Sequence, residues 1–193
     1  MNKLYSIPEA FVILFRAMRS LPVLRRSVKT GTLNEMWKER IMLAVTEVNG
    51  CAMCSYEHTK IALEAGMSGE EIAAMLAGEA DDIPKDELAS VMFAQHYASN
   101  RGKPTKAAWE RLNGVYGKEA ARAVLAAVQV IMLGNTVGIP MGSLRGRIKG
   151  KREQVDARSS ALYEVAMIFA MIVYMVPAAL TALFCAALRV KLF

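Results

Sequence analysis

Two cysteines and a histidine lie close together in the segment "NGCAMCSYEH", residues 49–58. His58 follows Cys54 by four positions and Cys51 precedes it by three, so a helix starting near Cys51 would place all three on one face. The free N–H groups and the dipole at a helix start stabilise a thiolate. His58 can then accept the Cys54 proton, and Cys51 can trap an oxidised Cys54 as a disulfide. This is the pattern that thiol redox catalysis needs.

Two structural interpretations compete with the redox one. A structural zinc site needs four ligands, and only His96 or a carboxylate is left to complete Cys51, Cys54 and His58. There is no second Cys-x-x-Cys motif, so the ligand count argues against a metal. Two small thiols buried in a core are the other alternative. The histidine one turn beyond Cys54 argues against that alternative.

The remaining cysteine and the N-terminus indicate a compartment. Glu9 and Arg16 interrupt the apolar run at the N-terminus, so the pattern of a cleavable signal peptide is absent. A secreted disulfide framework is therefore not expected, and a Cys-x-x-Cys pair in a non-secreted chain indicates redox or metal chemistry. Cys185 lies in an apolar tail and is most simply a small hydrophobic residue.

The stretch "ERIMLAVTEVNGCAMCSYEHTKIALEAGMSGEEIAAML" resembles the carboxymuconolactone decarboxylase-like superfamily, and more narrowly its alkylhydroperoxidase AhpD branch. That branch carries a glutamate, eleven residues, Cys-x-x-Cys, three residues and a histidine. Glu39, Cys51, Cys54 and His58 have this spacing here. The segment "LGNTVGIP" at 133–140 also resembles the end of that domain, so the resemblance covers about residues 5–141.

The resemblance implies a thiol-dependent peroxidase or disulfide oxidoreductase. In similar proteins the second cysteine, here Cys54, attacks the hydroperoxide, and the first, Cys51, resolves the sulfenic acid as a disulfide. His58 and Glu39 would relay the proton. Some members carry a histidine directly before the second cysteine, where this chain has Met53. The relay here is therefore expected to be shorter or differently tuned.

The same resemblance implies the partners. No bound cofactor or metal is expected, and an external dithiol or lipoyl-type reductant would regenerate the cysteines. Similar proteins are homo-oligomers, commonly trimers or hexamers. Two alternatives stay open: a decarboxylase-type enzyme on the same fold, and a non-catalytic, membrane-tethered oligomer whose cysteines form a redox-sensitive link. The decarboxylases of the superfamily typically lack the cysteine pair, which favours the peroxidase.

The elements that position these residues are predicted to be helices. Ser6 and Pro8 open the first one, which is expected to break at Pro22 and the following "KTGT". Asn34 is a candidate cap for the second, and a third runs from about residue 51 to 65. Glu39 could reach the cysteines if these two helices form a hairpin at Asn49–Gly50; without the family spacing it would be taken for a solvated helix charge.

The rest of the first 142 residues is expected to continue in helices. Ser68 and Glu71 form a capping-box pattern, and a charged turn follows at 81–87. Two further helices precede a long apolar one that is expected to end at Gly134 or soon after, with Asn135 at its end. The prediction is an all-α, AhpD-like domain of about seven helices over residues 1–142, followed by a C-terminal helix of the transmembrane type.

The tail divides into a basic linker, 143–160, and a hydrophobic helix, 161–193. Residues 141–160 hold six basic and two acidic side chains, which is +4 of the total charge of +6. The remainder is nearly neutral, so no nucleic-acid surface is expected. Residues 165–188 contain no charged side chain. At ~1.5 Å per residue this run would extend roughly 36 Å, enough to cross a bilayer.

The basic residues indicate an orientation for a membrane helix. Six flank the apolar run on its N-terminal side, whereas Arg189 and Lys191 follow it. The positive-inside rule then places residues 1–160 in the cytoplasm, where the linker would attract anionic head groups. The alternatives are a helix buried in an oligomer interface of a cytoplasmic protein and a linker that is merely solvated.

Overall fold

The computed structural model describes residues 4–77 and 83–188, and every regular element in those ranges is a helix. The elements are α1 (Ile7–Lys29), α2 (Glu35–Asn49), α3 (Ala52–Glu64), α4 (Gly69–Leu76), α5 (Leu88–Ser99), α6 (Lys106–Ile148), the short 3₁₀-helix η1 (Arg152–Gln154) and α7 (Ala161–Ala187). The all-α prediction is confirmed. The expected charged turn begins outside the described residues, and so does the basic flank Arg189 and Lys191.

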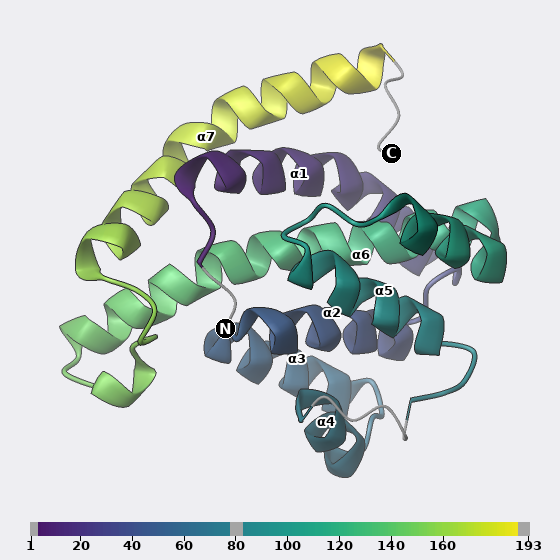
Figure 1. Cartoon of the computed structure of the whole chain (residues 1–193), viewed down its shortest axis with the longest axis horizontal. Helices are drawn as coiled ribbons and strands as arrows, with labels where there is room; N and C mark the ends of the chain where they lie inside the picture. The colour runs from purple at the N-terminus through teal and green to yellow at the C-terminus, as the bar shows by residue number, and fades with distance from the viewer. Residues whose placement is uncertain (1–3, 78–82, 189–193) are drawn as a thin grey trace.

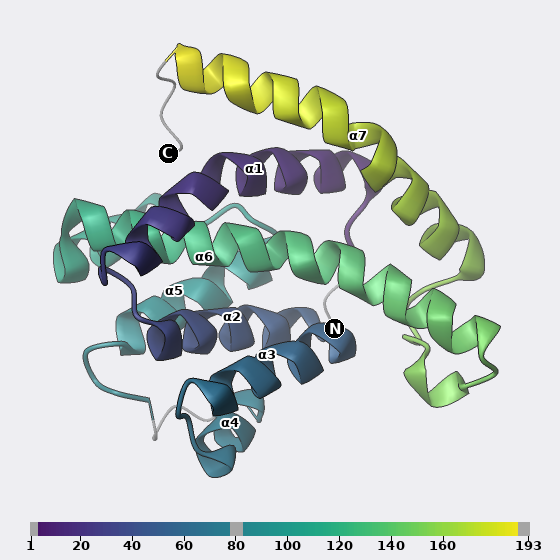
Figure 2. The same cartoon turned by 180° about the vertical axis from the view of Figure 1, so that it is seen from behind.

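The helices are arranged in layers around α6, which runs through the middle of the molecule (Figures 1 and 2). On one side α1 packs on α6, and α7 packs along the outside of α1. On the other side α2 and α5 cover α6, the start of α3 also reaches α6, and α4 lies beyond α2 and α3. The main hydrophobic core lies between α2, α5 and α6, and a second, smaller core fills the space between α1, α6 and α7.

Local capping signals fix several helix starts as the sequence predicts. The Asn34 side chain accepts from the backbone N–H of Trp37 at 2.8 Å, and the Ser68 hydroxyl accepts from Glu71 at 3.1 Å. At the start of α1, Ser6 and Glu9 form a capping box. These contacts satisfy backbone donors that have no partner inside the helix.

Two expected helix ends are wrong. Pro22 lies inside α1, which continues to Lys29 because the residues beyond the proline, Leu24 and Ser27 among them, are buried against the rest of the domain. The long apolar helix does not end near Gly134 but continues through Pro140 to Ile148. In both cases packing of the following turns outweighs the hydrogen bond that proline removes.

Gly117 marks the boundary between the two helices predicted for residues 104–134. Its φ of 73° and ψ of 170° are not helical, and α6 is kinked there. A positive φ is accessible to glycine at little cost, so the chain can change direction within one continuous element.

The C-terminal apolar helix is present as α7, and α6 and α7 are both long and apolar enough to cross a membrane. Length and composition alone are weak evidence, since the corresponding window of α6 is 72% buried and that of α7 only 22%. The division into 1–142, 143–160 and 161–193 stays a prediction. The structure adds that α6 runs through residue 142 and that α7 packs on both α1 and α6.

Candidate active site

A tight turn between α2 and α3 builds the cysteine segment. Gly50 ends α2 in the left-handed conformation, with a φ of 67°. Cys51 then caps α3, and Cys54 is the third residue of that helix. Both sulfurs therefore lie at the positive end of the α3 dipole, where the free backbone N–H groups favour a thiolate.

The two cysteines form a disulfide, with their Cα atoms 5.3 Å apart. Cys51 Sγ also accepts the backbone N–H of Cys54, at 3.3 Å. Only 1% of Cys51 and 7% of Cys54 is exposed. Cys54 is thus the slightly more exposed residue of the pair, and its role as the attacking residue stays a prediction.

Glu39 and His58 meet beside this pair. His58 Nδ1 lies 2.7 Å from Glu39 Oε2, and the Glu39 side chain is fully buried. This contact leaves Nε2 of the ring for proton exchange. Since His58 is one turn after Cys54, the imidazole lies on the same face of α3 as the sulfur. The Glu39 carboxylate therefore holds the imidazole ring in one orientation.

Lys38 balances the charge of the buried carboxylate. Its Nζ lies 3.1 Å from Glu39 Oε1 and also contacts Glu35. Burial alone would lower the pKa of Lys38, but the hydrogen bonds and negative charges of Glu35 and Glu39 outweigh burial and raise it. The ammonium group of Lys38 is therefore a charged partner for the buried Glu39 side chain.

Gly138 of α6 is a site residue that the sequence analysis missed. A Cβ atom at this position would lie 2.6 Å from Cys54 Sγ and 2.8 Å from Cys51 Sγ. It would also lie 3.4 Å from Met53 Cε. The backbone of α6 thus approaches the disulfide more closely than any side chain permits. The only sequence signal is a glycine inside "LGNTVGIP", which was interpreted as a helix end.

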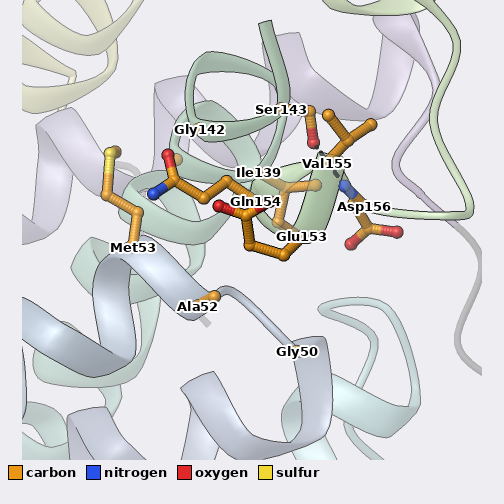
Figure 3. Close-up of a pocket in the computed structure, with 11 residues that line it drawn as sticks. Gly50, Ala52, Met53, Ile139, Gly142, Ser143, Glu153, Gln154, Val155 and Asp156 are labelled. Atoms are coloured by element: carbon orange, nitrogen blue, oxygen red, sulfur yellow. Dashed lines mark hydrogen bonds between the residues drawn. The ribbon is translucent and has the colours of Figure 1, made fainter. Parts of the chain in front are cut away.

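A small pocket of about 110 Å³ adjoins the cysteine segment (Figure 3). One wall comes from the start of α3, a second from α6, and the third from the segment after α6. The lining residues are Gly50, Ala52, Met53, Gly138, Ile139, Gly142, Ser143, Glu153, Gln154, Val155 and Asp156. Gly138 belongs to this lining and also contacts the disulfide, so the pocket lies directly beside the sulfurs.

Met53 extends from the start of α3 toward Gly142 in this view, across the side of the pocket (Figure 3). It also lines a wider hollow of about 400 Å³ on the outer side, together with Tyr56, Arg145 and Lys149. Met53 thus lines both spaces, and the wider one, the vestibule, carries acidic residues, Glu57 and Glu153, as well as basic ones. Its thioether packs near the sulfurs and has no proton to relay, in keeping with the departure noted in the sequence.

The segment after α6 is fixed to the cysteine turn by Arg158. Its guanidinium donates to the carbonyl oxygens of Asn49 at 3.0 Å and Gly50 at 3.2 Å, directly before Cys51. Asp156 orients Arg158, and the Asp156 backbone N–H donates to Ser143 Oγ at 2.9 Å. Hydrogen bonds from Arg158 lower the pKa of Asp156. The predicted linker is therefore a structural part of the site.

The other residues weighed from the sequence lie elsewhere or have other roles. His96 Nε2 accepts the backbone N–H of Thr105 at 3.1 Å, at the start of α6. Asn135 is not a helix end but a fully buried residue of α6 that contacts Thr46 of α2. In the ranges 4–77 and 83–188, no three histidine, cysteine or acidic side chains converge as metal ligands.

Comparison with known proteins covers the segment that carries these residues. Residues 18–92 match the carboxymuconolactone decarboxylase family. The match includes Glu39, Cys51, Cys54 and His58 and ends before Gly138, and it confirms the family resemblance drawn from the sequence. The uncharacterized protein YdfG of Bacillus subtilis (strain 168) is 24% identical over 128 residues, which are 65% of this chain and 87% of that protein. No solved structure matches the chain.

Proposed function

We propose that this chain is a thiol-dependent peroxidase or disulfide oxidoreductase of the alkylhydroperoxidase type. The observation that carries the proposal is a cysteine pair at the start of α3, one turn from a histidine held by a buried glutamate. The Cys54 thiolate attacks the outer oxygen of a hydroperoxide, and the O–O bond breaks. The alkoxide leaves as an alcohol with a proton from His58, and Cys54 becomes a sulfenic acid.

The second half of the cycle restores the thiols. The Cys51 thiol attacks the Cys54 sulfur, a disulfide forms, and the sulfenic oxygen leaves as water. An external dithiol, of the lipoyl or a similar type, then reduces the disulfide by two thiol–disulfide exchanges and is itself oxidised. The disulfide of the structure corresponds to the state before this reduction. Glu39 supports the imidazolium that forms when His58 holds the proton.

The test is peroxide consumption by the full chain with a dithiol reductant. Cys54→Ser should abolish turnover, since the remaining thiol, Cys51, is almost fully buried and would have no second cysteine to form the disulfide. Cys185→Ser is the matched control, because this free cysteine lies in α7. Its rate should equal that of the wild type. Equal rates for Cys54→Ser and the wild type would refute the proposal.

Two further variants assign the roles within the pair. Cys51→Ser should accumulate a sulfenic acid on Cys54, detected by mass spectrometry after trapping with dimedone. His58→Gln should lower the rate by about 10²–10⁴, the usual contribution of a general acid–base group. A double Cys51→Ser, Cys54→Ser variant that keeps full activity on a lactone carboxylate would instead support the decarboxylase alternative.

A further inference from the structure

The outward face of α7 is one continuous apolar stripe. Its residues follow the helical spacing of three or four positions, with two adjacent pairs, and are each more than half exposed: Leu162, Val165, Phe169, Ile172, Val173, Val176, Leu180, Leu183 and Phe184. Residues 165–188 contain no charged side chain that would interrupt it. A soluble surface rarely exposes an apolar patch of this length, so the stripe indicates a binding partner.

The opposite face of α7 is attached to the folded domain. Met167 and Ala178 are fully buried against α1 and α6. The Phe11 and Tyr174 rings meet edge to face, with centroids 5.2 Å apart, and the Tyr163 hydroxyl donates to the carbonyl of Tyr5. Figures 1 and 2 show α7 lying along the outer side of α1. This face therefore cannot contact lipid while the domain stays folded.

An ion pair between a buried glutamate and a partly exposed arginine fixes the start of α7 as well. Glu164 is fully buried, and Arg147 of α6 donates to both of its carboxylate oxygens, at 2.9 and 3.0 Å. If α7 crossed the bilayer, it would either have to separate from α1 or carry α1 into the membrane with it. Since α1 carries Arg16, Arg19 and other charged residues, moving it into hydrocarbon is costly. The packing is that of a helix lying parallel to a membrane surface.

Cations lie beside the first turns of α7. Arg145 and Lys149 line a hollow with Ile168 of α7 and with Ile148, which is largely exposed. Lys151 and Arg152 follow on the exposed segment after α6. Exposed apolar side chains next to cations match the boundary between acyl chains and anionic head groups.

An apolar groove that adjoins the stripe at Ile172 gives a further indication of lipid. It measures about 370 Å³ and is lined only by apolar residues of α1, α6 and α7: Leu14, Leu133, Val137, Met141, Ile168, Met171, Ile172 and Met175. Met141 and Ile168 also line the hollow that holds Arg145 and Lys149. A hydrocarbon groove that leads to two cations fits one acyl chain with an anionic head group.

We propose that the chain binds an anionic lipid bilayer with α7 in the plane of one leaflet. The outward stripe then lies among the acyl chains, and Arg145 and Lys149 lie at the head groups. The same two cations line the vestibule outside Met53, so the mouth of the cysteine site would face the membrane surface. The proposal does not depend on the peroxidase activity.

The first test uses the oxidised full chain in flotation with vesicles of phosphatidylcholine, with or without phosphatidylglycerol. Wild type should float with the anionic vesicles, and less so in high salt, because exposed charges are screened. Val173→Asp, on the stripe, should weaken binding at least about tenfold, since it moves a charge into the acyl region. Val115→Asp is the matched control, because Val115 is an equally exposed valine of α6 away from α7.

A second pair of measurements separates lying in the plane from crossing. A nitrobenzoxadiazole label on Cys185, near the end of α7, should be bleached by dithionite added outside the vesicles. A label that is protected until detergent is added would mean that α7 crosses the bilayer, and this overturns the proposal. Arg145→Glu with Lys149→Glu should reduce flotation with anionic vesicles while leaving the far-ultraviolet circular dichroism spectrum unchanged.

The flotation experiment has further outcomes that would contradict membrane binding by α7. Equal flotation of wild type and Val173→Asp would overturn the proposal, as would a wild type that stays unbound. If the unbound wild type forms oligomers in light scattering that Val173→Asp dissociates, the stripe is an interface between copies of this chain.

Discussion

The helices α6 and α7 have similar apolar compositions and opposite surroundings. Both pass a length and hydropathy test for crossing a membrane, yet 72% of the α6 window and 22% of the α7 window is buried in the fold. Around α6, the helices α1, α2, α3, α5 and α7 all contribute contacts, and Gly138 brings its backbone against the sulfurs of Cys51 and Cys54. α7 has α1 and α6 on one side and no described residue on the other. The helices packed around an apolar helix, more than its own composition, therefore decide whether it is buried in a core or exposes an apolar surface.

Polar side chains also differ between the buried helix α6 and the exposed face of α7. Along α6, the Gln129 amide accepts from Ser20 and donates to Tyr97, and Thr46 contacts Asn135. These contacts connect α6 to α1, α5 and α2. They specify how α6 packs on these helices, because a shift of α6 along its axis would leave buried polar atoms without hydrogen-bond partners. In α7 the Thr181 hydroxyl donates to the carbonyl of Pro177 in the same helix. Nothing comparable fixes a partner on its outward face.

The largest expected effect comes from placing one charge in each helix. Val128 of α6 is fully buried and Val173 of α7 is half exposed. Val128→Asp should lower the free energy of unfolding by about 3–5 kcal/mol or prevent folding, because it buries a carboxylate without a partner. Val173→Asp should change it by less than about 1 kcal/mol.

Urea unfolding followed by circular dichroism, with both variants in the same detergent-containing buffer, measures this difference. Similar losses for the two variants would show that the outward side of α7 is covered in solution. The contrast between the two helices would then be wrong.

The parts of the fold that follow from local signals could be predicted from the sequence. Asn34 and Ser68 cap their helices through contacts within three residues, and such contacts can be recognised in the order of residue types. Cys51 and Cys54 fall at a helix start because Gly50 ends the preceding helix. Glu39 needed the family spacing, since a glutamate between a lysine and an arginine otherwise predicts a solvated charge.

The features that depend on distant segments could not be predicted in this way. Pro22 and Gly134 resemble helix ends, and only packing against other helices shows that the chain continues. Gly138 has no distinguishing signal in the sequence, and its role becomes visible only when the sulfurs of Cys51 and Cys54 are placed against it. Arg158 belongs to a run of basic residues, and its bonds to Asn49 and Gly50 join segments more than 100 positions apart. From its composition, that run is predicted to be a solvated linker. In the fold, the segment forms one wall of the pocket beside the cysteines.

A smaller effect should separate two glycines of α6 that lie one turn apart. Gly138→Ala would bring a methyl group within 2.8 Å of both sulfurs. It should lower the stability of the oxidised protein by about 1–3 kcal/mol and slow peroxide turnover, because the disulfide and α3 must shift. Gly142→Ala places its Cβ at an ordinary 3.7 Å from Met53. It should be neutral or stabilising by about 0.5–1 kcal/mol, since alanine favours a helix interior.

Urea unfolding of the oxidised form and the peroxidase assay measure both glycine variants. If both alanines behave alike in these two measurements, the close approach of α6 to the sulfurs is not a constraint, and the role of α6 as a site wall fails.

The smallest effect concerns the attachment of α1, which carries α7. Glu9 accepts two hydrogen bonds from Arg101, which lies between α5 and α6, and these bonds lower the pKa of Glu9 to about 2 from its ordinary value of 4.5. The unfolded chain therefore binds this proton more readily than the folded one. The stabilisation is complete above about pH 4.5 and is lost as the pH falls toward 2.

Glu9→Gln should remove this part of the pH dependence, so that its unfolding free energy falls less between pH 5 and pH 3 than that of the wild type. Urea titrations at the two pH values measure the difference. Parallel losses in both proteins would mean that Glu9 does not hold α1, and with it α7, on the domain. The attachment would then rest on the other contacts of α1, such as the Phe11–Tyr174 ring contact and the hydrogen bond from Ser20 to Gln129.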